Sequence, residues 1–245
     1  MLQEEILIVW KLFTTKEMKS NFIHVCFIID ESSSMWTSVN DVKGGFAKII
    51  EEQRANEEGT CAISIFRFAT VPKEADFIME DIENVYPELA YNPSGCTAMY
   101  DGIGKAIDEI GERLAAMPED ERPEKNLIVI MTDGEENSSH NYQPSKVREM
   151  IKHQEDKYSW TFLYIGTDIS NTRDADRIGI GRKFATVRSK MGKSYDTINS
   201  VVSCYRNTAG DASLKAATMD MCLDSNISSL NAEYSEDTGV NISNG

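Results

Sequence analysis

The stretch Phe22-Ile-His-Val-Cys-Phe-Ile-Ile-Asp30, followed at once by Glu31-Ser32-Ser33-Ser34, decides the fold of this chain. Its apolar run is almost continuous, which is typical of a strand covered on both faces of a parallel sheet. The same pattern recurs in residues 126–133 and 160–166. Three buried strands are therefore predicted, and the first two end in a carboxylate.

Helical patterns and weaker strands lie between and after these runs. Residues 61–68 are interrupted by Ser64 and Arg67, so we expect this strand nearer an edge, with residues 77–85 pairing antiparallel to it and residues 184–187 forming a short last strand. Strands that alternate with helices predict a mostly parallel sheet with right-handed crossovers and helices on both faces. Helical spacing is seen in four groups of apolar residues: Val42, Phe46 and Ile49; Ile103, Ile107, Ile110 and Leu114; Val147 and Ile151; Ile198, Val201, Val202 and Tyr205.

The composition narrows the function class. The chain has 245 residues, of which 41% are hydrophobic and 27% charged, and 25 Lys and Arg against 40 Asp and Glu give a net charge of −15. Such an acidic chain repels phosphate backbones and anionic lipid, so neither nucleic acid nor membrane is expected as a partner. The five cysteines are scattered without CxxC spacing, which argues against a disulfide framework and favours a reducing, cytoplasmic location.

The chain is predicted to hold one domain with two appendages. Residues 1–19 are interpreted as an N-terminal extension and residues 20–207 as the domain. From about Leu223 the sequence turns to Ser, Asn, Asp and Gly without a core pattern. Residues 208–245 are therefore expected to form a polar, partly disordered tail.

Three loops with oxygen-bearing side chains follow the predicted strands or precede a predicted helix. In a doubly wound sheet such loops meet at the carboxyl ends of the strands, where the strand order reverses. Oxygen ligands without His or Cys select a hard divalent cation, Mg²⁺ by preference and Mn²⁺ or Ca²⁺ by substitution. We expect the hydroxyl groups to bind the ion directly and the carboxylates to act through waters or hydrogen bonds. The predicted metal site comprises Asp30, Ser32, Ser34, Thr97 and Asp133.

This pattern, Asp30-x-Ser32-x-Ser34 with Thr97 and Asp133-Gly134, resembles the metal-ion-dependent adhesion site (MIDAS) of von Willebrand factor A (VWA) domains. The resemblance implies a Rossmann-like α/β fold, a six-stranded sheet in the order 3-2-1-4-5-6 with strand 3 antiparallel at the edge. It also implies metal-dependent capture of an Asp or Glu of a partner protein, without catalysis. Further similarity to short stand-alone VWA proteins of bacteria and their phages lies in residues 44–46, 97–101, 124–139, 151–158 and Trp160.

Three other interpretations stay open. Ser and Asp clusters after strands are also common helix caps and turns. The domain is alternatively a structural subunit of a bacterial or phage complex, in which the ion only ties three loops together. A metal-dependent phosphohydrolase using Asp30 is the enzymatic alternative, but the D-x-D start expected for it is replaced by Asp30-Glu31-Ser32.

Several neighbouring residues are candidates for additional functional roles. Glu31 is one residue out of phase with the serines and should point away from the metal. Asp101 is interpreted as an acid at a helix start, and Asp168 as a candidate support for the ligands. Cys96 is interpreted as a half-buried thiol rather than a redox gate, and His24 as a core histidine with satisfied ring nitrogens. The basic stretch 173–193 is expected to be a solvated face, and the last helix, residues 194–206, a candidate for movement on ligand capture.

Overall fold

The computed structural model describes residues 21–167, 172–187 and 191–240. Its sheet has six strands in the order β3-β2-β1-β4-β5-β6. Each neighbouring pair is parallel except β2 with β3, which is antiparallel. This arrangement confirms the predicted fold class and strand order. The strands are β1 (Phe22–Asp30), β2 (Thr60–Phe68), β3 (Phe77–Asp81), β4 (Lys125–Thr132), β5 (Thr161–Gly166) and β6 (Lys183–Ala185).

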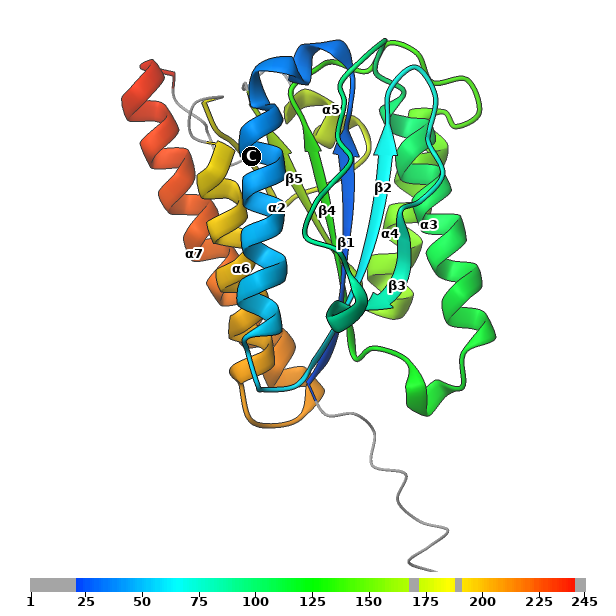
Figure 1. Cartoon of the computed structure of the whole chain (residues 1–245), viewed down its shortest axis with the longest axis vertical. Coiled ribbons are helices and arrows are strands. Elements are labelled where there is room, and N and C mark those ends of the chain that lie inside the picture. Colours follow the sequence, from blue (N-terminus) through cyan, green and yellow to red (C-terminus); the bar gives the residue numbers. More distant parts are fainter. Residues whose placement is uncertain (1–20, 168–171, 188–190, 241–245) are drawn as a thin grey trace, which may run out of the picture.

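The helices cover both faces of the sheet (Figure 1). The first face carries α2 (Val39–Arg54), α6 (Met191–Asn207) and α7 (Ala212–Thr238), and the second carries α3 (Met99–Ala116), α4 (Pro144–Tyr158) and α5 (Thr172–Arg177). Successive β1 residues therefore bury in opposite directions, with Phe27 in the first core and Ile28 in the second. This two-sided burial is the reason for the continuous apolar runs of β1 and β4. Short 3₁₀ helices connect the elements: η1 (Ser33–Ser38), η2 (Ile82–Asn84) and η3 (Glu119–Glu121).

The register of the central strands brings the ends of β1 and β4 to the same rim of the sheet. Asp30 pairs with Phe68 of β2, and Ile29 pairs with Met131 of β4. Asp30 and Thr132 thus end neighbouring parallel strands at the same edge of the sheet. The predicted metal ligands depend on this alignment.

Helices α2 and α6 pack closely against each other at Gly45. A Cβ atom at Gly45 in α2 would overlap the ring of Tyr195 in α6. Tyr195 is fully buried there, so glycine is required at this position by packing. The segment 44–46 quoted for the resemblance therefore has a structural role between two helices.

The C-terminal part of the chain corrects a prediction. Residues 212–238 form the helix α7 instead of a polar tail, and residues 194–206 lie within α6, which is therefore not the last helix. Met219, Leu223 and Ile227 of α7 are buried in the first core. The prediction was wrong because the buried stripe recurs only every fourth residue and is otherwise surrounded by Ser, Asn and Asp. The extension 1–19 lies outside the described residues, and the domain limits 20 and 207 stay a prediction.

The predicted strand 77–85 is shorter in the structure. β3 ends at Asp81, whose carboxylate caps η2 by accepting a hydrogen bond from the backbone N–H of Glu83. Arg54 then donates to the carbonyl oxygens of Ile82 and Val85, which keeps this segment against α2. The segment after β3 is therefore held by side-chain hydrogen bonds instead of strand pairing.

Candidate metal centre

Asp30 forms the base of the candidate site at the end of β1. Its carboxylate accepts hydrogen bonds from the backbone N–H of Ser32 at 2.7 Å and from Thr132 Oγ1 at 2.6 Å. The side chain is buried, and this desolvation raises the pKa of Asp30 to about 6, although the two hydrogen bonds oppose the shift. The negative charge of Asp133 adds to the rise in pKa. The two carboxylates therefore lie close enough to repel each other.

Oxygens from two chain segments converge beside Gly134, which lies on a third segment. A Cβ atom added there would lie 3.1 Å from Thr97 Oγ1, 3.2 Å from Ser34 Oγ and 3.6 Å from Asp30 Oδ2. Ser32 Oγ in turn lies 2.9 Å from Ser34 Oγ. The space that Gly134 leaves open is thus bordered by oxygen atoms, as expected of a site for a hard cation. The residues present fit a divalent ion.

Backbone hydrogen bonds hold Thr97 in place. Its N–H donates to Asn137 Oδ1 at 2.9 Å, and its carbonyl accepts from the N–H groups of Asn137 and Ser138. The loop that carries Ser32 and Ser34 is tied to the Thr97 loop, because the N–H of Ser33 donates to the carbonyl of Gly95. The Thr97 hydroxyl is therefore positioned by contacts with two other loops.

Glu31 points away from this site, as predicted. Its buried carboxylate lies 3.0 Å from Arg67 Nη1 and 2.7 Å from Lys73 Nζ. It also accepts the backbone N–H of Asn92 at 2.6 Å. Asp30 and Glu31 are thus adjacent acids with different roles, and Glu31 anchors the segment between β3 and α3.

Comparisons with known proteins identify the fold. No family model and no curated protein matches the sequence. The von Willebrand factor domain of the pilus tip protein Mfa5 from Porphyromonas gingivalis is 11% identical, with a TM-score of 0.52 over 77% of this chain and 97% of that one. The chain has the von Willebrand factor A fold.

Two further solved structures share this VWA fold arrangement. Proximal thread matrix protein 1 of the mussel byssus is 18% identical with a TM-score of 0.54, and the match covers 74% of this chain and 46% of that one. The PilB minor pilin of Streptococcus sanguinis is 14% identical with a TM-score of 0.52, covering 77% and 62%. The chain thus spans about half the length of the mussel protein. At such identities the similarity shows the fold alone.

Within the VWA fold, two carboxylates hold the loop after β4. Asp101 lies at the start of α3, as predicted, but its contacts with this loop were not predicted. Asp101 in the first turn of α3 accepts the backbone N–H groups of His140, Asn141 and Tyr142. Glu136 accepts those of Tyr100, Ser138 and Ser139. These carboxylates position the Gly134 loop against the Thr97 loop. The sequence signal for these contacts was that Asp101 and Glu136 both lie in the resembling blocks, residues 97–101 and 124–139.

The remaining candidate residues have ordinary roles. His24 is buried, with Nδ1 2.9 Å from Asn126 Oδ1 and Nε2 2.8 Å from Ser64 Oγ, which confirms the interpretation of a satisfied core histidine. Cys96 is exposed, so the expected half-buried thiol is wrong. Its backbone N–H donates to Thr70 Oγ1. Asp168 lies outside the described residues.

Four basic side chains of the stretch 173–193 form ion pairs within the part of the chain that the structure describes. Arg177 pairs with Asp174, Arg182 with Asp220 and Asp224, Lys183 with Asp176, and Lys193 with Glu233. These four side chains are therefore less available to an acidic partner. None of the helices in the described residues is long and apolar enough to cross a bilayer.

Proposed function

We propose that this chain is a divalent-metal-dependent protein-binding module that uses Asp30, Ser32, Ser34, Thr97 and Asp133 to hold Mg²⁺ and captures an acidic side chain of a partner protein. The observation that carries the proposal is the convergence of Thr97 Oγ1, Ser34 Oγ and Asp30 Oδ2 around the space beside Gly134. Mn²⁺ or Ca²⁺ are substitutes for the same oxygen ligands.

The ligand chemistry supports capture of a carboxylate. Ser32, Ser34 and Thr97 supply uncharged oxygens, so a bound cation would keep positive charge for an external carboxylate. Among residues 21–167, 172–187 and 191–240, no group of three or more His, Cys, Asp and Glu is arranged to hold a metal. The hydroxyl groups therefore carry much of the proposed binding.

Charge explains why the metal would be needed for recognition. The chain has a net charge of −15, so it repels an acidic partner at long range. A cation at the rim would provide a local attraction for a carboxylate. The partner's affinity should therefore depend on the metal.

The similar structures support binding over catalysis. By their names, the Mfa5 and PilB proteins are pilus proteins and the mussel protein is a thread matrix protein. The VWA fold therefore recurs in proteins of extended assemblies. We propose that this chain is not an enzyme. We also propose the cytoplasmic location, on the five free cysteines of the described structure.

A structural metal is the second candidate, favoured by the many hydrogen bonds between the three loops. The two functions differ in what Ser34→Ala does. In a binding module the variant weakens capture of the partner, whereas a purely structural ion predicts lower stability with unchanged capture. Measuring both quantities on one variant separates them.

Thermal melting with MgCl₂ and with EDTA tests the metal site. We expect Mg²⁺ to raise the melting temperature and Asp133→Ala to abolish the rise. Asp156→Ala is the matched control, because Asp156 is an exposed acid in α4. Equal melting of the wild-type chain in Mg²⁺ and EDTA would contradict the proposal.

Partner capture tests the binding function. The immobilised chain is incubated with lysate of its native host in Mg²⁺ or EDTA, and the Mg²⁺-specific protein is purified. We expect it to bind the wild-type chain and not Asp133→Ala. Substituting its contacting Asp or Glu by Asn or Gln should remove binding, and a partner that binds equally in EDTA would contradict the proposal.

A further inference from the structure

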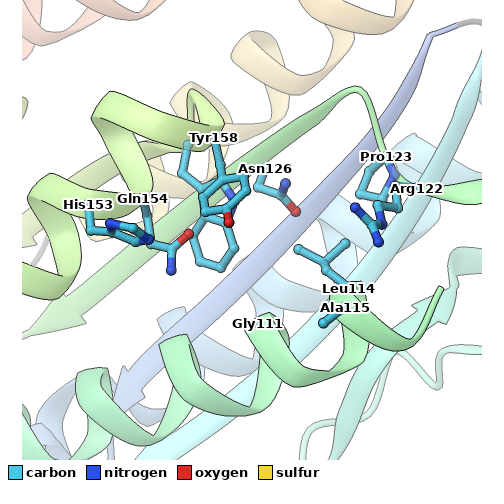
Figure 2. Close-up of a pocket in the computed structure, with 10 residues that line it drawn as sticks. Gly111, Leu114, Ala115, Arg122, Pro123, Asn126, His153, Gln154 and Tyr158 are labelled. Atoms are coloured by element: carbon cyan, nitrogen blue, oxygen red, sulfur yellow. The ribbon is translucent and has the colours of Figure 1, made fainter. Parts of the chain in front are cut away.

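A separate cavity opens at the other end of the sheet. Its volume is about 480 Å³, and it lies between the C-terminal turns of α3 and α4 and the start of β4 (Figure 2). Small-molecule sites usually have volumes of roughly 300–1,000 Å³. The cavity shares no lining residue with the proposed metal site, so an inference about it stands independently.

One side of the cavity is suited to a flat ring. Trp160, directly before β5, is 4% exposed, and Tyr158 at the end of α4 is 51% exposed. The ring of His153 packs edge-on against Tyr158 at 5.7 Å. On the α3 side Leu114 and Gly111 line the cavity, and a Cβ at Gly111 would meet no atom within 4 Å. The cavity therefore offers aromatic and aliphatic surfaces with open space between them.

Arg122 supplies a cation at the same cavity. Its Nε donates to the carbonyl of Met117 at 3.1 Å. Within the part of the chain that the structure describes, no salt bridge is formed by its guanidinium, in contrast to the paired arginines at positions 67, 177 and 182. In Figure 2 Arg122 lies across the cavity from His153 and Gln154. A planar guanidinium with free terminal N–H groups is suited to a carboxylate.

Asn126 adds an oriented hydrogen-bond donor. Its Oδ1 is bound to His24 Nδ1, so that nitrogen carries the proton and His24 Nε2 accepts from Ser64. The Ser64 oxygen accepts the N–H of Met79, which is consistent with this direction. The amide NH₂ of Asn126 is thus the half that can donate to a ligand in the cavity.

We propose that this cavity binds a small aromatic carboxylic acid, with its ring between Tyr158 and Leu114 and its carboxylate at Arg122. The ring gains burial against Trp160, and the anion gains charge-assisted hydrogen bonds from the guanidinium. A neutral ring compound would lose the second interaction. A free carboxylate without a ring would lose the first.

The test is a titration with 2-naphthoate, followed by the fluorescence of Trp160. The chain has three Trp residues, so Trp10→Phe with Trp36→Phe leaves Trp160 as the reporter. We expect saturable quenching in the sub-millimolar range, as suits a ligand of this size. We expect at least tenfold weaker binding of 2-naphthylmethanol. Absence of saturable binding, or equal affinity for the acid and the alcohol, would overturn the proposal.

Two variants locate the binding. Arg122→Gln should weaken 2-naphthoate at least tenfold and leave 2-naphthylmethanol unchanged, and Gly111→Leu should block both ligands by filling the cavity. Gly192→Leu is the matched control, because a Cβ at this helical glycine of α6 also meets open space. Circular dichroism is used to check that each variant is folded. Unchanged 2-naphthoate binding in folded Gly111→Leu or Arg122→Gln would overturn the assignment.

Discussion

The two ends of β1 both carry buried polar groups, but these groups are satisfied in different ways. His24 near the start of the strand has both ring nitrogens paired with neutral groups of neighbouring strands. Asp30 at the end is also hydrogen-bonded, yet it lies in a cluster of oxygens that includes a second carboxylate, Asp133. The cluster around His24 is closed, in the sense that its groups are neutral and hydrogen-bonded to one another. The cluster around Asp30 is open to a ligand, in the sense that it contains two carboxylates.

This difference separates groups that stabilise the fold from groups that suit a ligand. At the start of the sheet the buried residues Lys215 and Glu124 form an ion pair, since Lys215 Nζ lies 3.1 Å from Glu124 Oε2. At the rim, Asp30 and Asp133 raise the free energy of the isolated protein by mutual repulsion. A cation would remove that repulsion. Substitutions at the start of the sheet should therefore change the stability of the fold, and the rim with Asp30 and Asp133 should respond to metal.

The largest expected effect on stability is at the closed end. Among the described residues, Lys215→Met leaves the Glu124 carboxylate, which is 9% exposed, with the neutral donors Tyr205 and Asn21. We expect a loss of about 3 kcal/mol in the free energy of unfolding, because one partner of a buried ion pair is removed. Urea denaturation measures the loss.

Lys152→Met is the control for this prediction. Lys152 is 76% exposed and pairs with Asp156 on the surface of α4, so its loss should change stability by less than about 0.5 kcal/mol. Equal effects of the two substitutions would show that the pair at Lys215 is not a closed buried pair. The Mg²⁺ response should be unchanged in both variants.

The next effect concerns the open end. Gly134→Ala places a methyl group 3.1 Å from Thr97 Oγ1 and 3.2 Å from Ser34 Oγ, within the space proposed for the ion. At a Mg²⁺ concentration of one hundred times the dissociation constant, the wild type gains about 2.7 kcal/mol of stability. We expect the variant to lose this gain, as measured by urea denaturation with and without Mg²⁺.

Gly111→Ala is the matched control at the other end. Its added Cβ meets no atom within 4 Å, and alanine favours a helix over glycine by about 1 kcal/mol. This variant should therefore be more stable and keep the full Mg²⁺ response. A Mg²⁺ response that survives in Gly134→Ala would mean that the ion binds elsewhere.

The fold and the proposed site were predictable to different degrees. The buried strands and the outward direction of Glu31 follow from local periodicity, and the strand order followed from the VWA resemblance. The hydrogen bonds of Asp101, Glu136 and Asn137 did not follow, because each joins segments far apart in sequence whose loop conformations have no local signal. The helix α7 was not predicted for a different reason. Its buried stripe includes the polar residues Lys215 and Asn231, so the local pattern resembles that of an exposed segment.

Acid should weaken the closed end through His24. Burial lowers its pKa from 6.5 to about 4. Above pH 6.5 both states are neutral and no effect is expected, whereas below it the unfolded chain takes up a proton that the folded chain does not. The contribution of His24 should therefore cost about 2 kcal/mol of stability between pH 7 and pH 5.

Comparison with His24→Gln isolates this contribution, since other groups also titrate in the same interval. Glutamine keeps a donor and an acceptor but has no charged form. Urea denaturation at pH 7 and pH 5 should show a smaller loss on acidification in the variant than in the wild type. Parallel losses would mean that His24 is protonated in the folded chain, and the closed network would then need a different description.

The smallest effect tests how the open end is held in shape. The hydroxyl of Ser33 donates to the carbonyl of Gly95 at 3.0 Å, which links the loop of Ser32 and Ser34 to the Thr97 loop. Ser33→Ala removes this exposed bond and should cost about 0.5 kcal/mol. Ser33→Gly also frees the backbone and should cost about 1 kcal/mol. If the link orders the ligands, both variants should also weaken Mg²⁺ binding in the same order, as measured by calorimetric titration. A weaker Mg²⁺ affinity in Ser33→Gly alone would assign the ordering to backbone stiffness, and unchanged affinity in both would show that the oxygens beside Gly134 are positioned without Ser33.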